Sequence, residues 1–287
     1  MTGLSDTSYP HPATLCCASI SWATYSQPYR KTLIGSEMPS QVRVNARHAP
    51  KLSLPPGFQL VTLREVGDSF AFAKQKASDL GAATLVHVGR FDLAEFAVVL
   101  EPEEPLVIAR RAFYAGMCAL GDALAAHAPP EKPIVYAWPD TILVDGGIVG
   151  GGRLAWAEGP DDQYPDWLVF GTMIRTVAMR DGAAGLNPLA AALDEEGFED
   201  VQSAQLAESF ARHLMVHVDA WQESGFPAVA RAYLSRLPAP AGTSFGLAEN
   251  GDLLVRTVAA PGVDRRALEP CLAGVPSWLD PATGGPR

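Results

Sequence analysis

Residues 136–156 read Tyr-Ala-Trp-Pro-Asp-Thr-Ile-Leu-Val-Asp-Gly-Gly-Ile-Val-Gly-Gly-Gly-Arg-Leu-Ala-Trp, and this stretch decides the fold. The pattern predicts an apolar strand, a Trp-Pro-Asp corner, a second strand, a tight turn and a third strand rich in glycine. The turn falls at Asp145 and Gly146, because Asp-Gly between β-rich runs favours a hairpin whose positive φ glycine adopts freely. We therefore expect three strands that follow one another in a sheet.

Three consecutive glycines, Gly150, Gly151 and Gly152, stand inside the third predicted strand. Such a run weakens a strand and is tolerated where another backbone or a ligand must come close. Two interpretations are open: a bulge with crowded packing, or a side-chain-free wall for a ligand. The functional prediction rests on the second and expects an open hollow over the glycines. If the protein's own aromatic or aliphatic groups fill that hollow, only a folded domain of unknown purpose remains.

The same stretch resembles the core motif of the biotin/lipoate protein ligase family. In that family a Lys-Trp-Pro-Asn-Asp segment is followed by a hairpin with a Lys-(Ile/Leu)-Ala/Ser-Gly element. Trp138 and Pro139 match the motif, and Asp140 stands where the family has Asn. Gly146 matches the turn, and Gly151 matches the glycine beside which the vitamin ring lies.

Two lysines of the family motif are missing. Ala137 takes the position of the lysine before Trp in biotin ligases, and Ile148 takes the lysine position of lipoate ligases and octanoyltransferases. The family lysines neutralise charge on the carboxylate, the acyl-phosphate and the leaving group, which alanine and isoleucine cannot do. The chain has no lysine after Lys132, which is too distant from Ala137 to replace the missing one. Any cation at the reaction centre should therefore be arginine.

Two of the candidate arginines hold family positions of their own. Gly89 and Arg90 are what remains of the long Gly-Arg-Gly-Arg-Arg-Gly loop that folds over the adenylate in biotin ligases. Arg90 is either a surface cation or a clamp on a phosphate or carboxylate. Arg175 replaces the nucleotide-contacting Asn of a family strand in which Gly171 matches. It either pairs with a local carboxylate such as Asp140 or contacts an anion in the ligand pocket.

The resemblance covers residues 54–256 and implies an α+β fold. We expect a mixed, largely antiparallel sheet backed by helices, as in class II synthetase-like biotin ligase catalytic domains, with a small C-terminal β appendage. The implied enzyme activates biotin, lipoate or octanoate with ATP and Mg²⁺ and transfers it to a lysine of an acyl-carrier, biotinyl or lipoyl carrier domain. The implied site residues are Arg153, Arg175 and Asp140 for catalysis, Arg90, Trp138, Gly150, Gly151 and Gly152 for the substrate, and Gly89 and Gly171 for the cofactor. The alternative is a catalytically inactive module of the same fold that binds the biotin or lipoyl group.

The sequence divides into three parts. Residues 1–50 show no sustained period and predict a disordered extension, with Met38 as a candidate start and a weak secretory signal as the competing interpretation. Residues 51–238 form the predicted catalytic domain, whose apolar spacing predicts helices over 69–80, 103–128, 202–222 and 226–237. Residues 239–287 predict a short SH3-like β appendage, with a hairpin on an Asn-Gly turn, and a loose tail.

Composition limits the partners. The 287-residue chain has a formal net charge of −10, which argues against binding to nucleic acid or anionic membranes. No uncharged apolar run approaches the roughly 18 residues of a membrane span. The four cysteines have neither a disulfide framework nor metal spacing, which favours a reduced, cytoplasmic setting. His213 and His217 are four residues apart but lack a cysteine or glutamate companion, so we expect no metal site there.

Overall fold

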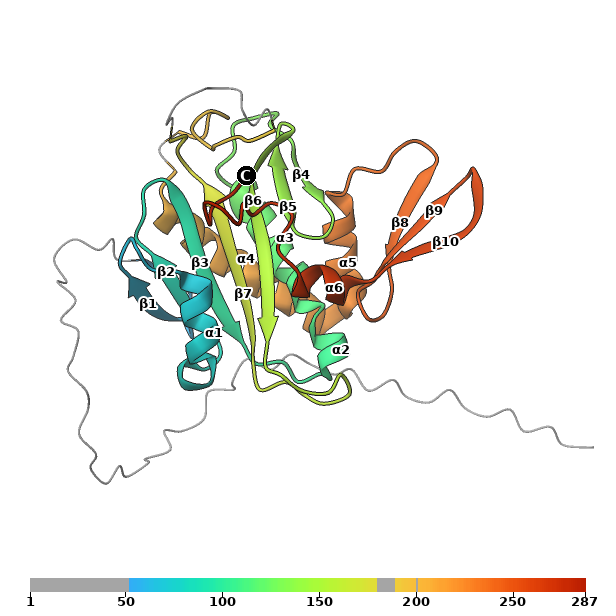
Figure 1. The fold of residues 1–287 in the computed structure, drawn as a ribbon, viewed down its shortest axis with the longest axis horizontal. Coiled ribbons are helices and arrows are strands. Elements are labelled where there is room, and N and C mark those ends of the chain that lie inside the picture. Colours follow the sequence, from blue (N-terminus) through green and yellow to red (C-terminus); the bar gives the residue numbers. More distant parts are fainter. Residues whose placement is uncertain (1–51, 180–188, 200) are drawn as a thin grey trace, which may run out of the picture.

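The computed structural model describes residues 52–179, 189–199 and 201–287. The predicted disordered extension over residues 1–50, including Met38, lies outside this part of the chain. Within the described part, no helix has both the length and the apolar character that crossing a membrane requires. Figure 1 shows a large sheet with helices on both faces and a smaller sheet at its side.

Seven strands form the large sheet, in the order β1-β2-β3-β7-β6-β5-β4. The strands are β1 (Gln59–Leu63), β2 (Thr84–Val88), β3 (Leu93–Leu100), β4 (Ile134–Ala137), β5 (Thr141–Val144), β6 (Gly147–Trp156) and β7 (Leu168–Arg175). β1 and β2 are parallel, and each other neighbouring pair is antiparallel, which confirms the predicted sheet. β4, β5 and β6 are the three strands expected from residues 136–156. Asp145 and Gly146 both have positive φ in the turn that joins β5 to β6.

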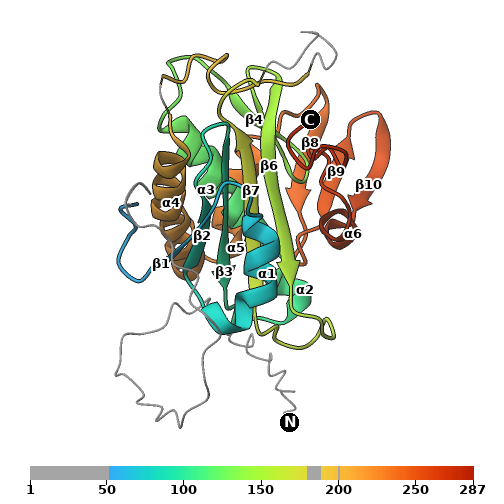
Figure 2. The ribbon, with the colours of Figure 1, turned by 60° about the vertical axis from the view of Figure 1, so that its left-hand side comes forward.

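The helices cover the two faces of the large sheet unequally (Figure 2). α1 (Ser69–Leu80) packs against β2, β3 and β7 on what we call the α1 face. The opposite, helical face carries α3 (Ala112–Ala125), α4 (Ser203–Ser224) and α5 (Phe226–Ser235), and α2 (Leu106–Ala109) leads into α3. Asp68 begins α1, because its carboxylate accepts a hydrogen bond from the Ala71 amide at 2.9 Å. α1 does not cover the part of the α1 face formed by β5 and β6, and another segment of the chain lies there.

The expected single helix over residues 103–128 is wrong, because the chain forms α2 and α3 there. Arg111 stands between the two helices and binds partners that local sequence does not reveal. Its Nη2 donates to both carboxylate oxygens of Glu104, at 3.2 and 3.1 Å, and its Nη1 donates to the Glu249 carbonyl at 3.0 Å. Arg111 and Glu104 are both buried. This internal ion pair therefore fixes the corner between the helices and joins it to the small sheet.

Aromatic rings fill the space between the sheet and the helices. Phe170 of β7 is buried and stacks on Phe210 of α4, with centroids 5.7 Å apart and planes inclined by 9°. Phe113 of α3 lies 6.0 Å from Phe170, again between ring centroids. A Cβ atom on Gly116 or Gly152 would lie 2.4 or 2.9 Å from the Phe170 ring, so glycine allows this close approach. Phe170 therefore forms the back of the glycine run in β6.

His87 of β2 is buried on the helical face. Its Nε2 lies 3.0 Å from Ser203 Oγ at the start of α4, and its Nδ1 has no hydrogen-bond partner among the described residues. Burial lowers the pKa of His87 from 6.5 to about 4. The imidazole is therefore neutral in the folded protein near neutral pH.

Acidification is expected to weaken the fold through His87. Between pH 6.5 and about 4 the unfolded state binds more protons than the folded state, so stability falls as the pH falls. The contribution is fully present above pH 6.5, and about 3 kcal/mol is lost by about pH 4. Urea denaturation of the native chain and of His87→Gln across this range measures the effect. The native midpoint should drop further than that of the variant, and parallel curves would contradict the assignment.

The small sheet contains β8 (Thr243–Leu247), β9 (Leu253–Thr257) and β10 (Ala260–Arg266), and α6 (Leu268–Ala273) follows it. The expected hairpin on the Asn-Gly turn is confirmed, and Gly251 has a φ of 88° there. The expected loose tail is wrong. Residues 275–287, which we call the strap, turn back onto the α1 face (Figure 1), and their Trp278 is fully buried.

Candidate functional site

The glycine run of β6 is enclosed by protein atoms. A Cβ atom on Gly150 would lie 1.9 Å from the Met173 carbonyl oxygen, and the pairing register of β5 and β6 shifts at this point. A Cβ atom on Gly151 would lie 1.9 Å from the Asp140 carbonyl oxygen and 2.4 Å from the Trp278 ring. Glycine is needed because main chain and a buried ring come this close. The bulge and crowded packing therefore account for the run.

The prediction of an open hollow over the glycines is wrong. The indole of Trp278 fills the space in front of Gly151, while Met117 and Phe170 pack behind Gly152. Taken alone, this packing would reduce the functional prediction to a folded domain of unknown purpose. The occupant is informative, however, because Trp278 belongs to the strap and not to the sheet that forms the wall.

Trp278 lies in a small apolar recess on the α1 face. We call this recess the cradle; it consists of Leu93, Ile148, Gly151 and Met173. The Trp278 Nε1–H group donates a hydrogen bond to the Gly152 carbonyl at 3.1 Å, and Leu279 packs against the same cluster. The cradle thus accepts a flat, apolar ring that carries one N–H donor.

Asp140 holds the strap beside the cradle. Its Oδ2 accepts a hydrogen bond from the Ser277 amide at 3.0 Å, and its Oδ1 accepts one from the Ser277 hydroxyl. Thr141 Oγ1 donates to Asp140 Oδ1 at 3.1 Å and lies 2.9 Å from Ser277 Oγ. The carboxylate is thus engaged by the strap.

Arg175 holds the other end of the strap. Its Nη1 donates to the Arg287 carbonyl at 3.2 Å, and its Nη2 donates to the Pro286 carbonyl. The suggested ion pair with Asp140 does not form, since both ends of the guanidinium bind strap carbonyls. Burial lowers the pKa of Arg175, although the nearby Glu195 carboxylate acts in the opposite direction. Arg175 is therefore a half-buried cation at the edge of the cradle, which suits it to an anionic ligand.

Arg153 and Gly171 lie under α1, also on the α1 face. Arg153 Nη2 donates to Asp68 Oδ1 at 3.2 Å, and its guanidinium carbon lies 4.2 Å from the centroid of the Phe70 ring. A Cβ atom on Gly171 would lie 2.4 Å from that same ring. Burial lowers the pKa of Arg153, and the carboxylates of Asp68 and Glu95 act against this. These two residues serve the packing of α1 in this conformation.

Glu95 is a site candidate that the sequence reasoning missed. It is buried in β3, where its Oε1 accepts hydrogen bonds from the Ser69 amide at 2.9 Å and the Ser69 hydroxyl at 3.3 Å. Burial raises the pKa of Glu95, and the Ser69 amide acts in the opposite direction. The signal was present, because Glu95 is the one charged residue in Leu93–Leu100, just as Arg175 is in its strand.

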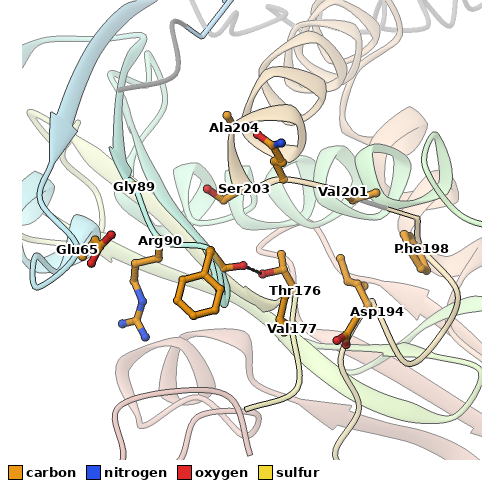
Figure 3. A pocket seen from close by; sticks show the side chains of 13 residues that line it. Glu65, Gly89, Arg90, Thr176, Val177, Asp194, Phe198, Val201, Ser203 and Ala204 are labelled. Atoms are coloured by element: carbon orange, nitrogen blue, oxygen red, sulfur yellow. Dashed lines mark hydrogen bonds between the residues drawn. The ribbon is translucent and has the colours of Figure 1, made fainter. Parts of the chain in front are cut away.

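Gly89 and Arg90 line an open pocket of about 580 Å³ at the ends of β2 and β7 and the start of α4 (Figure 3). Arg90 Nε and Nη2 donate to the two oxygens of Asp92, at 3.0 and 2.7 Å. This pairing raises the pKa of Arg90 and lowers that of Asp92. Arg90 is thus already clamped by a carboxylate of its own chain.

Trp138 contacts none of the other predicted site residues through a hydrogen bond that the structure records. Its Nε1–H group donates to the Tyr114 hydroxyl at 3.0 Å, and that hydroxyl donates to the Gly251 carbonyl at 2.6 Å. Trp138 is partly buried against the helical core. Through these hydrogen bonds Trp138 connects the corner between β4 and β5 to α3 and to the small sheet.

Four of the predicted residues contact the strap, and Gly150 adjoins them in β6, while Gly89, Arg90, Trp138, Arg153 and Gly171 have other partners or surroundings. Gly151 pairs with Met173, and Arg175 lies two positions further along β7 on the same face. Asp140, Gly151, Gly152 and Arg175 all contact the strap. Ser277 and Trp278 complete this site; sequence analysis missed them, and the signal was a lone tryptophan in a Pro- and Gly-rich segment.

The described lining of the pocket beside Arg90 offers little positive charge to a nucleotide triphosphate. A triphosphate needs cations, but Arg90 is the one cation among the described residues that line the pocket, and Asp92 already holds it. Glu65 and Asp194 add negative charge to the same pocket.

Comparisons with known proteins agree on one family. The model of the biotin/lipoate A/B protein ligase family matches residues 54–235. No curated protein matches the chain.

Solved structures show the same fold. A biotin protein ligase-like protein of unknown function from Silicibacter sp. TM1040 is 28% identical, with a TM-score of 0.64 over 75% of this chain and 96% of that one. The biotin protein ligase from Aquifex aeolicus is 18% identical, with a TM-score of 0.57 over 73% and 95% of the two chains. The same enzyme in complex with biotin and ATP is 16% identical, with a TM-score of 0.54 over 73% and 99%.

Proposed function

The chain belongs to the biotin/lipoate A/B protein ligase family, and from this premise we propose that it binds a small, largely apolar carboxylic acid of the biotin or lipoyl/octanoyl class in the cradle. The observation that carries the proposal is the present occupant. An indole is a flat bicycle with one N–H donor, and here that donor reaches the Gly152 carbonyl. A guest of similar width and polarity fits the same surface once the strap moves aside.

Arg175 is the group that recognises the acid in this proposal. In the strapped form it donates hydrogen bonds to the main-chain oxygen atoms of Pro286 and Arg287. The carboxylate of a guest offers two oxygen acceptors and a full negative charge, and an Arg–carboxylate pair can form two parallel hydrogen bonds. Once the strap is released, the Asp140 carboxylate is available to orient an incoming amine. In this arrangement Arg175 supplies the positive charge that the family lysines would supply at positions 137 and 148.

Activation of the acid with ATP and Mg²⁺, followed by transfer to a carrier-domain lysine, is the fuller form of this function. The family supports it, and the nucleotide fit described above does not. Arg90 and Arg153 are already paired with Asp92 and Asp68. These pairings favour the second candidate, a module of the same fold that binds the acid and leaves it unreacted.

Calorimetry with biotin, lipoate and octanoate tests the proposal on the full chain carrying Trp278→Ala, which empties the cradle. One acid should bind, and adding Arg175→Met should weaken it by roughly 10- to 100-fold, because a charged hydrogen bond is lost. The amide of the same acid is the matched control, and it should bind both variants about equally. Equal weakening of acid and amide would place Arg175 in a merely structural role.

An ATP–pyrophosphate exchange assay separates the two candidates. Exchange that depends on one acid supports the ligase, and acid binding without exchange supports the binding module. If no acid and no nucleotide binds any variant, both candidates fail.

A further inference from the structure

We propose that the strap is an autoinhibitory element that occupies the cradle reversibly and keeps guests out. The inference rests on the proposed function, because it concerns the same recess. The strap adds a control on whether a ligand can reach that recess. The structural basis is that, among the described residues, the polar contacts of the strap with the sheet use groups that border the cradle.

The strap is folded on itself. Leu279 forms a β-bridge with Pro286, and the Arg287 amide donates to the Trp278 carbonyl at 2.8 Å. Asp280 and Gly285 close the intervening loop, with an amide-to-carbonyl distance of 2.9 Å. Because these bonds lie within the strap, they survive when it lifts. The strap can therefore leave the sheet as a unit.

Few interactions fasten the strap to the sheet. Asp140 holds Ser277, the Gly152 carbonyl accepts from Trp278, and Arg175 binds carbonyls near the end of the strap. The Trp278 ring supplies the main buried apolar surface, while residues 273–275, where α6 ends and the strap begins, are exposed. Together with the contact between the Thr141 and Ser277 hydroxyls, these attachments form a latch that a competing ligand can displace.

The strap and a guest compete for identical groups. The Trp278 ring and N–H group occupy Gly151 and the Gly152 carbonyl, and the strap carbonyls occupy Arg175. Both occupants cannot be present at once. The apparent affinity for a guest is then its intrinsic affinity multiplied by the fraction of chains with the strap released. Anything that releases the strap should tighten guest binding to the same degree.

Ser277→Pro weakens the strap without altering the cradle. Proline has no amide hydrogen and no hydroxyl, so both hydrogen bonds to Asp140 are lost. Bonds to a carboxylate of this kind correspond to roughly 10- to 100-fold in an equilibrium. Thr283→Ala is the matched control, because Thr283 is exposed on the strap loop and bonds only to Asp280 and Gly285 of the strap itself.

The experiment compares the native full chain with these two variants. Hydrogen exchange of residues 275–287 without ligand should rise about tenfold or more in Ser277→Pro and stay unchanged in Thr283→Ala. Calorimetry then measures the binding of biotin, lipoate and octanoate, and of free indole, a probe that has the ring and N–H group of Trp278 and no acid group. Ser277→Pro should bind indole, and the cognate acid, about tenfold or more tightly than the native chain.

The outcomes separate the two proposals. If indole binds more tightly to Ser277→Pro and no acid binds, the strap inhibits the cradle and the proposed function is wrong. If an acid binds equally to the native chain and to Ser277→Pro, the proposed function stands and autoinhibition is overturned. Unchanged hydrogen exchange together with unchanged indole binding also overturns it.

Discussion

Replacing Arg111 by methionine should lower the free energy of unfolding by about 3–5 kcal/mol. The change leaves the buried carboxylate of Glu104 without its partner, and an uncompensated internal charge is costly. It also removes the donor to the Glu249 carbonyl and the cation above the Phe226 ring, whose centroid lies 4.6 Å away. Guanidinium chloride denaturation followed by circular dichroism measures the loss as a lower midpoint.

The matched control removes both charges. Arg111→Met combined with Glu104→Met should recover at least half of the loss, because an apolar pair of similar volume is often neutral in place of a buried ion pair. A single substitution that costs less than about 1 kcal/mol would mean that water reaches Glu104 in solution. A double variant as unstable as the single one would assign the cost to the lost contact with the small sheet.

Phe170→Ala should cost about 3–5 kcal/mol, since it removes a buried ring and leaves a cavity between the sheet and α4. The ring packs on Phe210 and Phe113, and the two glycines that admit it, Gly116 and Gly152, cannot fill the gap. The measurement is the denaturation midpoint at an unchanged slope of free energy against denaturant.

Phe170→Leu is the matched control for this cavity. Leucine keeps most of the apolar volume, so its cost should be clearly smaller than that of alanine. Equal costs for leucine and alanine would show that ring stacking, and not volume, holds this part of the core. A loss near zero for both would contradict the buried position of Phe170.

The fold was predictable where local pattern determines structure. The Asp145-Gly146 turn and the apolar alternation around it give β4, β5 and β6, and the Asp68 cap gives α1. The corner at Arg111 was not predictable, because its partners Glu104 and Glu249 become visible only when the chain is folded. The apolar spacing of residues 103–128 is helical throughout and gives no sign of the corner between α2 and α3, where Arg111 pairs with Glu104.

The sequence indicated some of the residues that contact the strap, and it did not indicate the strap itself. The motif drew attention to Asp140, Gly151 and Arg175, which do share one region of the α1 face. Their roles toward a ligand remain predictions. Nothing periodic in residues 275–287 indicates that Ser277 finds Asp140, which is 137 residues away in the sequence. The glycine run at residues 150–152 would be the same whether the surface over it were open or covered, so the sequence does not distinguish the two cases.

The wall itself is one peptide layer thick. Trp278 presses on it at Gly151 from one side, and Met117 and Phe170 press on it at the next residue from the other, with no Cβ atom in between. A protein engineer could therefore widen the recess from behind: trimming Met117 to a smaller residue gives the strand space to recede toward α3. The size of ligand that the cradle accepts could then be adjusted through Met117, a side chain on the other face of the sheet that does not contact the ligand.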